Sequence, residues 1–184
     1  MKTYDIIAEP FCGIFGFSRA FFEVNPDFDG EIWLNDIDGR LIKILEQLKD
    51  NPNEQIECLK EELKKYSVDK ELSNDKNKSH TLKLITNTLN CRLCSIDNGT
   101  KKLNAYQNKL EDYKKFFSKV RLFNLNCKDF LKLITKDKKT FIYFDPPYFN
   151  SSNEQYDKHV ENDKSIYKDG TSIYIDILNT FKDA

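Results

Sequence analysis

Four short segments of the chain are rich in β-branched and aromatic residues, which is typical of β-strands. The first, second and fourth are nearly continuous apolar runs, as expected of parallel strands buried on both faces. Helical spacing of apolar residues follows the first two segments, and the second of these helices is expected to end at Asn51-Pro52. This alternation predicts a doubly wound α/β sheet. The predicted strands are Tyr4–Ala8, Glu31–Leu34, Val120–Leu125 and Thr140–Phe144.

Residues 51–119 carry no convincing strand pattern. Apolar residues recur there at helical spacing in three stripes, and polar turn-forming stretches separate the stripes. We therefore expect a helical insertion at 51–119 in an α/β core formed by residues 1–50 and 120–184. The stripes are Ile56, Leu59 and Leu63; then Leu82, Ile85 and Leu89; then Leu103, Tyr106, Leu110, Tyr113 and Phe117.

Composition and charge narrow the functional classes. The 184 residues suit one domain, and a formal net charge of -1 gives no global attraction to nucleic acid. No apolar run approaches the ~20 residues of a membrane span. The odd count of 5 cysteines suits a reducing, intracellular setting. Cys91-Arg92-Leu93-Cys94 has no second pair to complete a zinc site, so we expect no metal site there. From the lack of a long apolar run we expect no membrane association.

An acidic residue closely follows each predicted strand. These residues are Glu9, Asp36, Asp129 and Asp145. In a parallel sheet they would gather at the carboxyl edge, where ligands bind. Carboxylates accept hydrogen bonds from hydroxyl and amino groups but repel phosphates, which favours a nucleoside-like cofactor without phosphate. For Glu9 and Asp129 a role as a helix cap or solvated loop residue stays open.

The loop after the first strand contains Gly13 and Gly16. Glycines between a strand and a helix let the backbone pass close to a ligand, although the full dinucleotide fingerprint is absent. Asp145-Pro146-Pro147-Tyr148 is more specific. The prolines end the strand abruptly, and the Asp145 carboxylate, the Pro146 carbonyl and the Tyr148 ring together suit a planar base that carries an amino group.

These motifs resemble those of Dam-like DNA adenine methyltransferases, and they occur in the same order. The resemblance rests on Glu9-Pro10-Phe11 with the nearby glycines, Asn35-Asp36, Asp129-Phe130 and Asp145-Pro146-Pro147-Tyr148, and it covers nearly the whole chain. It implies a Rossmann-like methyltransferase sheet, S-adenosylmethionine as cofactor and double-stranded DNA as partner. The insertion lies where this family carries its target-recognition region.

The resemblance also implies residue roles. Glu9, Pro10, Phe11, Gly13 and Gly16 would line the cofactor pocket. Asp36 would bind the ribose hydroxyls, Asp129 would accept from the cofactor's adenine amine, and Phe130 would pack on that ring. Asp145, Pro146, Pro147 and Tyr148 would hold the target adenine, flipped out of the duplex, and Asp145 would also border the cofactor. Arg92, Lys101 and Lys102 in the insertion would meet DNA phosphates.

The chain departs from the family pattern in three places. The first loop has Phe15 where a Gly-x-Gly is usual, the Lys- and Gly-containing motif upstream of Glu9 is missing, and the chain ends before the strands that complete the sheet. The sheet is therefore expected to be incomplete, with a second chain as a candidate supplier of strands. A catalytically inactive or split remnant that binds nucleic acid or a partner remains the alternative.

A rival enzymatic reading is methylation of another amine, in RNA or a protein glutamine. Enzymes of those kinds tend to carry Asn at the position of Asp145, so this aspartate favours adenine in DNA. The recognition sequence stays open, as does the biological role, whether restriction-modification, regulation or a viral function.

Overall fold

A four-stranded parallel sheet forms the centre of the protein, with strand order β3-β2-β1-β4. The computed structural model describes residues 4–13, 15–68, 104, 107–135 and 137–146. The predicted α/β class and parallel, Rossmann-like sheet are confirmed. The strands are β1 (Ile6–Glu9), β2 (Glu31–Asn35), β3 (Val120–Phe123) and β4 (Thr140–Ile142).

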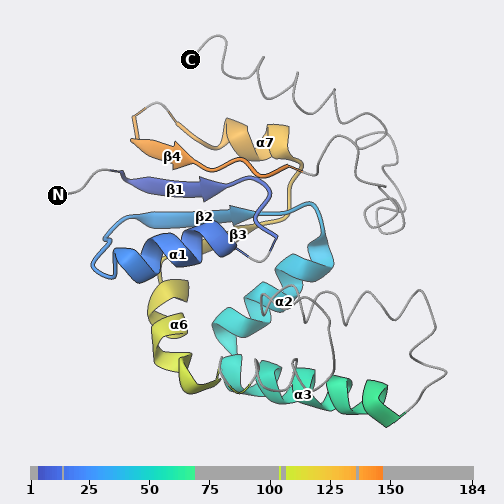
Figure 1. The fold of residues 1–184 in the computed structure, drawn as a ribbon. Coiled ribbons are helices and arrows are strands. Elements are labelled where there is room, and N and C mark those ends of the chain that lie inside the picture. The colour runs from blue at the N-terminus through green and yellow to red at the C-terminus, as the bar shows by residue number, and fades with distance from the viewer. Residues whose placement is uncertain (1–3, 14, 69–103, 105–106, 136, 147–184) are drawn as a thin grey trace.

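Helices cover both faces of this sheet, as Figure 1 shows. Alternation along the strands explains why both faces are apolar: Ile7 and Ile32 join the core on one side, whereas Ile6 and Trp33 join the core on the other. The larger core packs against α1, α2, α3 and α6, and the smaller core packs against α7. The helices are α1 (Gly16–Val24), α2 (Gly39–Asp50), α3 (Pro52–Val68), α6 (Leu110–Phe117) and α7 (Cys127–Lys132).

Two strands end earlier than the sequence pattern predicts. β3 ends at Phe123 because the next side chain, Asn124, donates to the carbonyls of Asp36 and Ile37, which draws the chain out of the sheet. β4 ends at Ile142, although the Tyr143 N–H still donates to the Ala8 carbonyl at 2.8 Å. Both departures lie at the carboxyl edge of the sheet.

The two described ends of segment 51–119 pack into the main core. Ile56 of α3 and Phe116 and Phe117 of α6 are each at most 2% exposed and belong to the same cluster as the sheet residues. The first helical stripe thus corresponds to α3, and Leu110, Tyr113 and Phe117 of the third lie in α6, whereas Leu103 and Tyr106 of that stripe lie outside the described residues. The second stripe, Leu82 to Leu89, lies outside the described residues, as do the side chains of Leu59 and Leu63. None of the described helices is long and apolar enough to cross a membrane.

Phe15 occupies the place where a small residue is usual, yet its ring is part of the core. The ring is 0% exposed, stacks on Phe116 at 5.5 Å and meets Phe117 edge-on at 5.7 Å. Its backbone is left-handed, with φ 48°, at the residue that caps α1. Such a conformation costs on the order of 1 kcal/mol for a residue with a Cβ. Burial of the ring offsets that strain, and it turns the ring into the sheet–helix core.

Replacing Phe15 by alanine tests this placement. We expect Phe15→Ala to lower the free energy of unfolding by about 3–5 kcal/mol, because it deletes a fully buried ring while keeping the strained backbone. Urea unfolding measures the change. Val24→Ala, at a side chain that is 80% exposed on the same helix, is the control and should stay within about 0.5 kcal/mol of the wild type. A Phe15→Ala change as small as the control's would contradict the core role.

Candidate active site

The strand order fixes where a ligand can bind. From β1 the chain builds β2 and β3 on one side, and then crosses to place β4 on the other side of β1. In open parallel sheets the crevice at such a switch point, outside the carboxyl ends of the strands, is the usual ligand site. Here β1 ends at Glu9, and Asp145 follows β4 by three residues. Two of the four predicted carboxylates therefore meet at the switch point.

Glu9 is a buried carboxyl group at the end of β1, with 2% of its surface exposed. Its Oε1 accepts the backbone N–H of Ser18, in the first turn of α1, at 2.7 Å. Burial raises the pKa of Glu9 to about 7; the contacts with Ser18 oppose this rise, and the charge of Asp145 adds to it. The interaction with Asp145 shows that the two carboxyl groups lie within electrostatic reach of one another.

Asp36 joins the loops that follow β1 and β2. Its Oδ2 accepts the backbone N–H of Gly13 at 3.0 Å, and its Oδ1 accepts that of Asp38 at 2.9 Å. Burial raises the pKa of Asp36, while these two hydrogen bonds counter the rise. Gly13 has φ +45°, a left-handed backbone that glycine adopts without strain. The glycine loop and the Asp36 carboxylate thus form one unit at the edge of the sheet.

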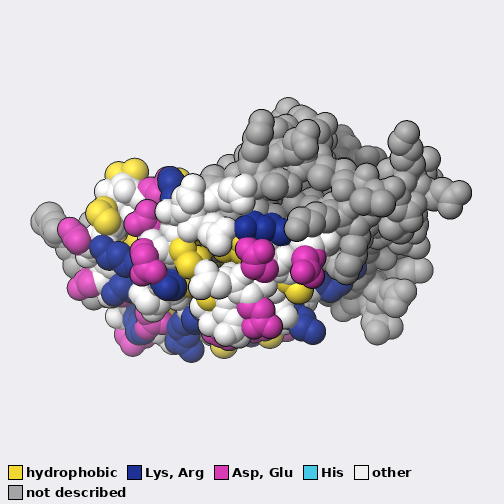
Figure 2. Space-filling view, turned by 90° about the horizontal axis from the view of Figure 1, so that it is seen from below, with side chains coloured by type: hydrophobic (Ala, Val, Ile, Leu, Met, Phe, Trp, Pro, Cys, Tyr) yellow, Lys and Arg dark blue, Asp and Glu magenta, His cyan; other side chains and the backbone are white. Residues whose placement is uncertain are grey.

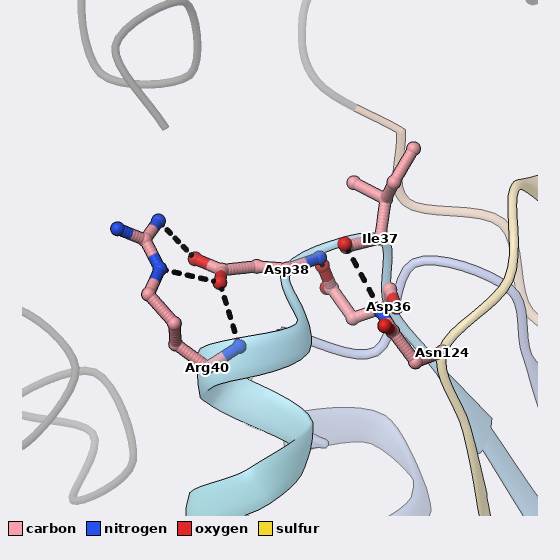
Figure 3. A network of polar contacts seen from close by, with 5 residues as sticks. All are labelled: Asp36, Ile37, Asp38, Arg40 and Asn124. Carbon is pink, nitrogen blue, oxygen red and sulfur yellow. Dashed lines mark hydrogen bonds and ion pairs between the residues drawn. The ribbon is translucent and has the colours of Figure 1, made fainter. Parts of the chain in front are cut away.

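Figure 3 shows how the loop after β2 is fixed from outside. The Asn124 amide donates to the carbonyls of Asp36 and Ile37 at 2.8 and 3.0 Å. Asp38 caps α2 by accepting the backbone N–H of Arg40, and its two oxygens bind the Arg40 guanidinium at 2.9 and 3.0 Å. The Asp36 backbone is therefore held by β3's exit on one side and by a helix cap on the other.

Asn35 is a structural residue of the site to which the sequence assigned no role. Its side chain is buried, donates to the carbonyls of Pro10 and Leu125 at 2.8 and 3.0 Å, and accepts the Leu125 N–H at 2.9 Å. Its own carbonyl accepts the Cys12 N–H at 2.8 Å. One residue therefore ties together the loops after β1, β2 and β3. The signal in the sequence is a polar residue at the end of an apolar strand.

The segment after β4 presents Asp145 to solvent and leaves Pro146 half-buried. Tyr143 hydrogen bonds to β1 through its backbone, so Asp145 stands just beyond the last sheet contact. Pro147 and Tyr148, which the sequence analysis placed against the target base, lie outside the described residues. Phe11 is half-buried and Pro10 is buried in the loop after β1.

Asp129 and Phe130 lie in α7, on the other face of the sheet. Asn126 caps this helix, and the Asp129 carboxylate accepts from the Asn126 amide and pairs with Lys132 at 2.6 Å. The pKa of Asp129 is lowered mainly by its hydrogen bond with the Lys132 ammonium and to a smaller extent by that with the Asn126 amide. Phe130 is 0% exposed and packs edge-on against Phe123 at 5.3 Å. Asp129 thus lies in the first turn of α7, bound to the capping residue Asn126 and paired with Lys132, and is not itself the cap.

The positive charges predicted to meet DNA, on Arg92, Lys101 and Lys102, lie outside the described residues. On the described surface in Figure 2, Lys and Arg side chains alternate with Asp and Glu. Several of these are ion pairs one turn apart on a helix, such as Lys114 with Glu111 at 2.7 Å in α6. No group of three His, Cys, Asp or Glu side chains within the described ranges is arranged to hold a metal ion.

Comparison with protein families identifies the class of chemistry. The chain matches the family model of D12 class N6 adenine-specific DNA methyltransferases over residues 1–183. The chain belongs to this family. The resemblance to Dam-like enzymes is thereby confirmed, and D12 class membership indicates an S-adenosylmethionine-dependent DNA adenine methyltransferase. A search of curated proteins found no match.

The buried Glu9 offers a test of the geometry of the carboxyl edge. Glu9→Gln keeps an oxygen that can accept the Ser18 N–H but cannot ionise. The folded wild type holds the Glu9 proton up to pH of about 7, whereas an exposed glutamate loses it near 4.5. Between these pH values the folded state binds more protons, so the free energy of unfolding of the wild type should fall as pH rises and level off above 7.

Chemical denaturation from pH 5 to pH 8 measures this effect. We expect the wild type to lose stability relative to Glu9→Gln across the window. Glu46→Gln, at an exposed position in α2, is the control and should follow the wild type at every pH. Parallel curves for the wild type and Glu9→Gln would show that Glu9 titrates like an exposed glutamate.

Proposed function

We propose that the carboxyl-edge site moves a methyl group from S-adenosylmethionine to the exocyclic amine of an adenine that is flipped out of double-stranded DNA. The observation that carries this proposal is the place of Glu9 and Asp145, at and just after the carboxyl ends of the neighbouring strands β1 and β4, at the switch point of the sheet. Family membership supplies the reaction class, and the position of these carboxylates supplies a site suited to it.

The residues around β1 and β2 fit the cofactor. The Glu9 carboxyl group is buried and that of Asp36 is half-buried, so they suit the ammonium and sulfonium charges and the ribose hydroxyls of a phosphate-free nucleoside. Asp36 already accepts two backbone N–H groups, but each carboxylate oxygen can accept a further hydrogen bond. When bound, the cofactor supplies an electrophilic methyl group. Pro10, Phe11 and the glycine loop would border it.

The segment after β4 suits the target amine. The exposed Asp145 carboxylate would accept one N–H of the adenine amine, and the Pro146 carbonyl would accept the other. Holding both hydrogens draws the nitrogen toward tetrahedral geometry and aims its lone pair, so catalysis comes from position and electrostatics. Tyr148 would stack on the ring. The base must leave the duplex because its amine is otherwise engaged in pairing.

The remaining predicted contacts, those of α7 and of the insertion, have different degrees of structural support. Phe130 is assigned to the core, because its ring has no exposed surface to offer a cofactor. The Asp129 carboxylate is half-exposed, and a cofactor amine would share oxygens that already accept from Asn126 and Lys132. Contacts of Arg92, Lys101 and Lys102 with DNA phosphates remain a prediction from the sequence.

Cofactor binding is the first test of this proposal. Calorimetric titration with S-adenosylmethionine should show binding to the wild type and affinity about ten- to hundred-fold weaker in Asp36→Ala, which loses a charged acceptor. Asp50→Ala, an exposed aspartate at the far end of α2, is the matched control and should bind like the wild type. A folded wild type that binds no cofactor would favour the remnant alternative.

Methyl transfer tests the role of Asp145. Asp145→Ala should lower kcat by about 10²–10³-fold or more, because the amine loses a fixed acceptor in the transition state. Cofactor affinity should change little. Tritium transfer from labelled S-adenosylmethionine to duplex DNA, together with calorimetry, separates the two quantities. Asp137→Ala, an exposed aspartate before β4, serves as control. Substantial activity in Asp145→Ala would overturn the proposed role.

A further inference from the structure

Two aromatic rings connect helix α1 to the segment that carries Asp145. Phe17, the second residue of α1, lies face to face with Tyr143, with ring centroids 4.3 Å apart and planes 4° from parallel. The same Phe17 ring contacts Phe141 at 5.5 Å. Among the described residues, this contact is closer and more nearly parallel than the ring contacts of Phe17 with Phe21 and Phe141 and of Phe141 with Tyr4. We call Phe17 and Tyr143 the aromatic stack.

The aromatic stack completes a ring of contacts around the switch point. The Tyr143 N–H donates to the Ala8 carbonyl at 2.8 Å, which joins the exit of β4 to β1. The Glu9 carboxylate accepts the Ser18 N–H at 2.7 Å, which joins β1 to α1. Phe17 precedes Ser18 and stacks on Tyr143, so the third side of the ring joins α1 back to the exit of β4.

The aromatic stack lies two residues before Asp145, in a segment where the two prolines that follow cannot donate backbone hydrogen bonds. Pro146 and Pro147 have no N–H to donate, and the sheet ladder ends two residues before Asp145. The side chains just before Asp145 pack on both faces of the sheet and so hold this segment. Phe144 packs with the smaller core on one face of the sheet, and Tyr143 packs on Phe17 on the other.

We infer that Phe17 is a positioning residue for methyl transfer, which sets the place of Asp145 through the face of Tyr143. The inference rests on the proposed function. By this inference, the first turn of α1 aligns the Asp145 segment with the loop that begins at Glu9. A displacement of about 1 Å between reacting groups lowers a rate by about a hundred-fold, so a loose segment is costly.

The test separates position from stability. Phe17→Leu and Tyr143→Leu should each lower kcat for DNA by roughly 10- to 100-fold, with the dissociation constant for S-adenosylmethionine changed by less than about three-fold. Tyr143→Phe should have the wild-type kcat, in contrast to Tyr143→Leu, because it keeps the ring face and loses only the hydroxyl. Phe17→Met keeps apolar volume without a ring face, so it should fold readily and still show the lowered kcat.

Phe21→Leu is the matched control, one turn further along α1. Its ring contacts Phe28 at 5.1 Å and, more loosely, Phe17 at 6.5 Å, so the variant removes packing on α1 while the face-to-face contact between Phe17 and Tyr143 is kept. It should lower the melting temperature about as much as Phe17→Leu while leaving kcat near the wild-type value. In the double variant Phe17→Leu/Tyr143→Leu, the fall in kcat should be close to that of either single variant, because both remove the same contact.

The outcomes distinguish this inference from the proposed function. If the wild type transfers no methyl group, the proposed function fails and this inference fails with it. If the wild type is active and Phe17→Leu and Phe17→Met have the same kcat as Phe21→Leu, only the inference is overturned. Additive losses in the double variant would also overturn it, since the two rings would then act independently.

Discussion

The amide of Asn35 is the interaction on which the carboxyl edge of the sheet depends. It is 1% exposed, and both its donor and acceptor ends are engaged by the backbone of neighbouring loops, at Pro10 and Leu125. A buried amide is tolerated when its polar groups are hydrogen bonded. Each buried backbone group that lost its hydrogen bond to Asn35 would destabilise the fold by about 1–3 kcal/mol. An apolar residue of the same size would leave three backbone groups without a partner.

The consequence of this pairing is that three strand exits are tied to one another by hydrogen bonds. The loop after β1 carries Glu9 and Gly13, the loop after β2 carries Asp36, and the loop after β3 leads through Leu125 into α7. Asp36 then adds a second tie between the first two loops through the Gly13 N–H. The exit of β4 is joined to β1 by the hydrogen bond from the Tyr143 N–H to the Ala8 carbonyl, to α1 by the aromatic stack, and to the smaller core by Phe144.

The sequence predicted the fold where local pattern and long-range packing agree. All four strands were found because apolar runs buried on both faces leave a strong local signal. Their ends were less predictable: β3 ends at Phe123 because Asn124 leaves the sheet for two carbonyls of a distant loop, and β4 ends at Ile142, just before the hydrogen bond from the Tyr143 N–H to the Ala8 carbonyl. Such contacts join residues far apart in the chain and have no local pattern.

The site shows the same division. Motifs located Glu9, Asp36 and Asp145, because carboxylates after apolar strands are visible in the sequence. Position in the sequence did not reveal that the ring of Phe15 turns into the core, since that depends on a left-handed backbone and on the rings of α6. Nor did it reveal that Phe130 is closed within the smaller core. The direction in which a side chain points depends on the residues that pack around it, and these are far away in the sequence.

The electrostatics of the edge give the last constraint on the ligand. Burial raises the pKa of both Glu9 and Asp36, so the protein holds two carboxyl groups where their ionised forms are poorly solvated. Cys12 lies near both, and their charges add to the rise that burial imposes on its pKa. A second anion, such as a pyrophosphate, would worsen this repulsion, whereas a cation would relieve it. Under the proposed function, a positively charged sulfonium nucleoside would therefore suit this edge better than a dinucleotide.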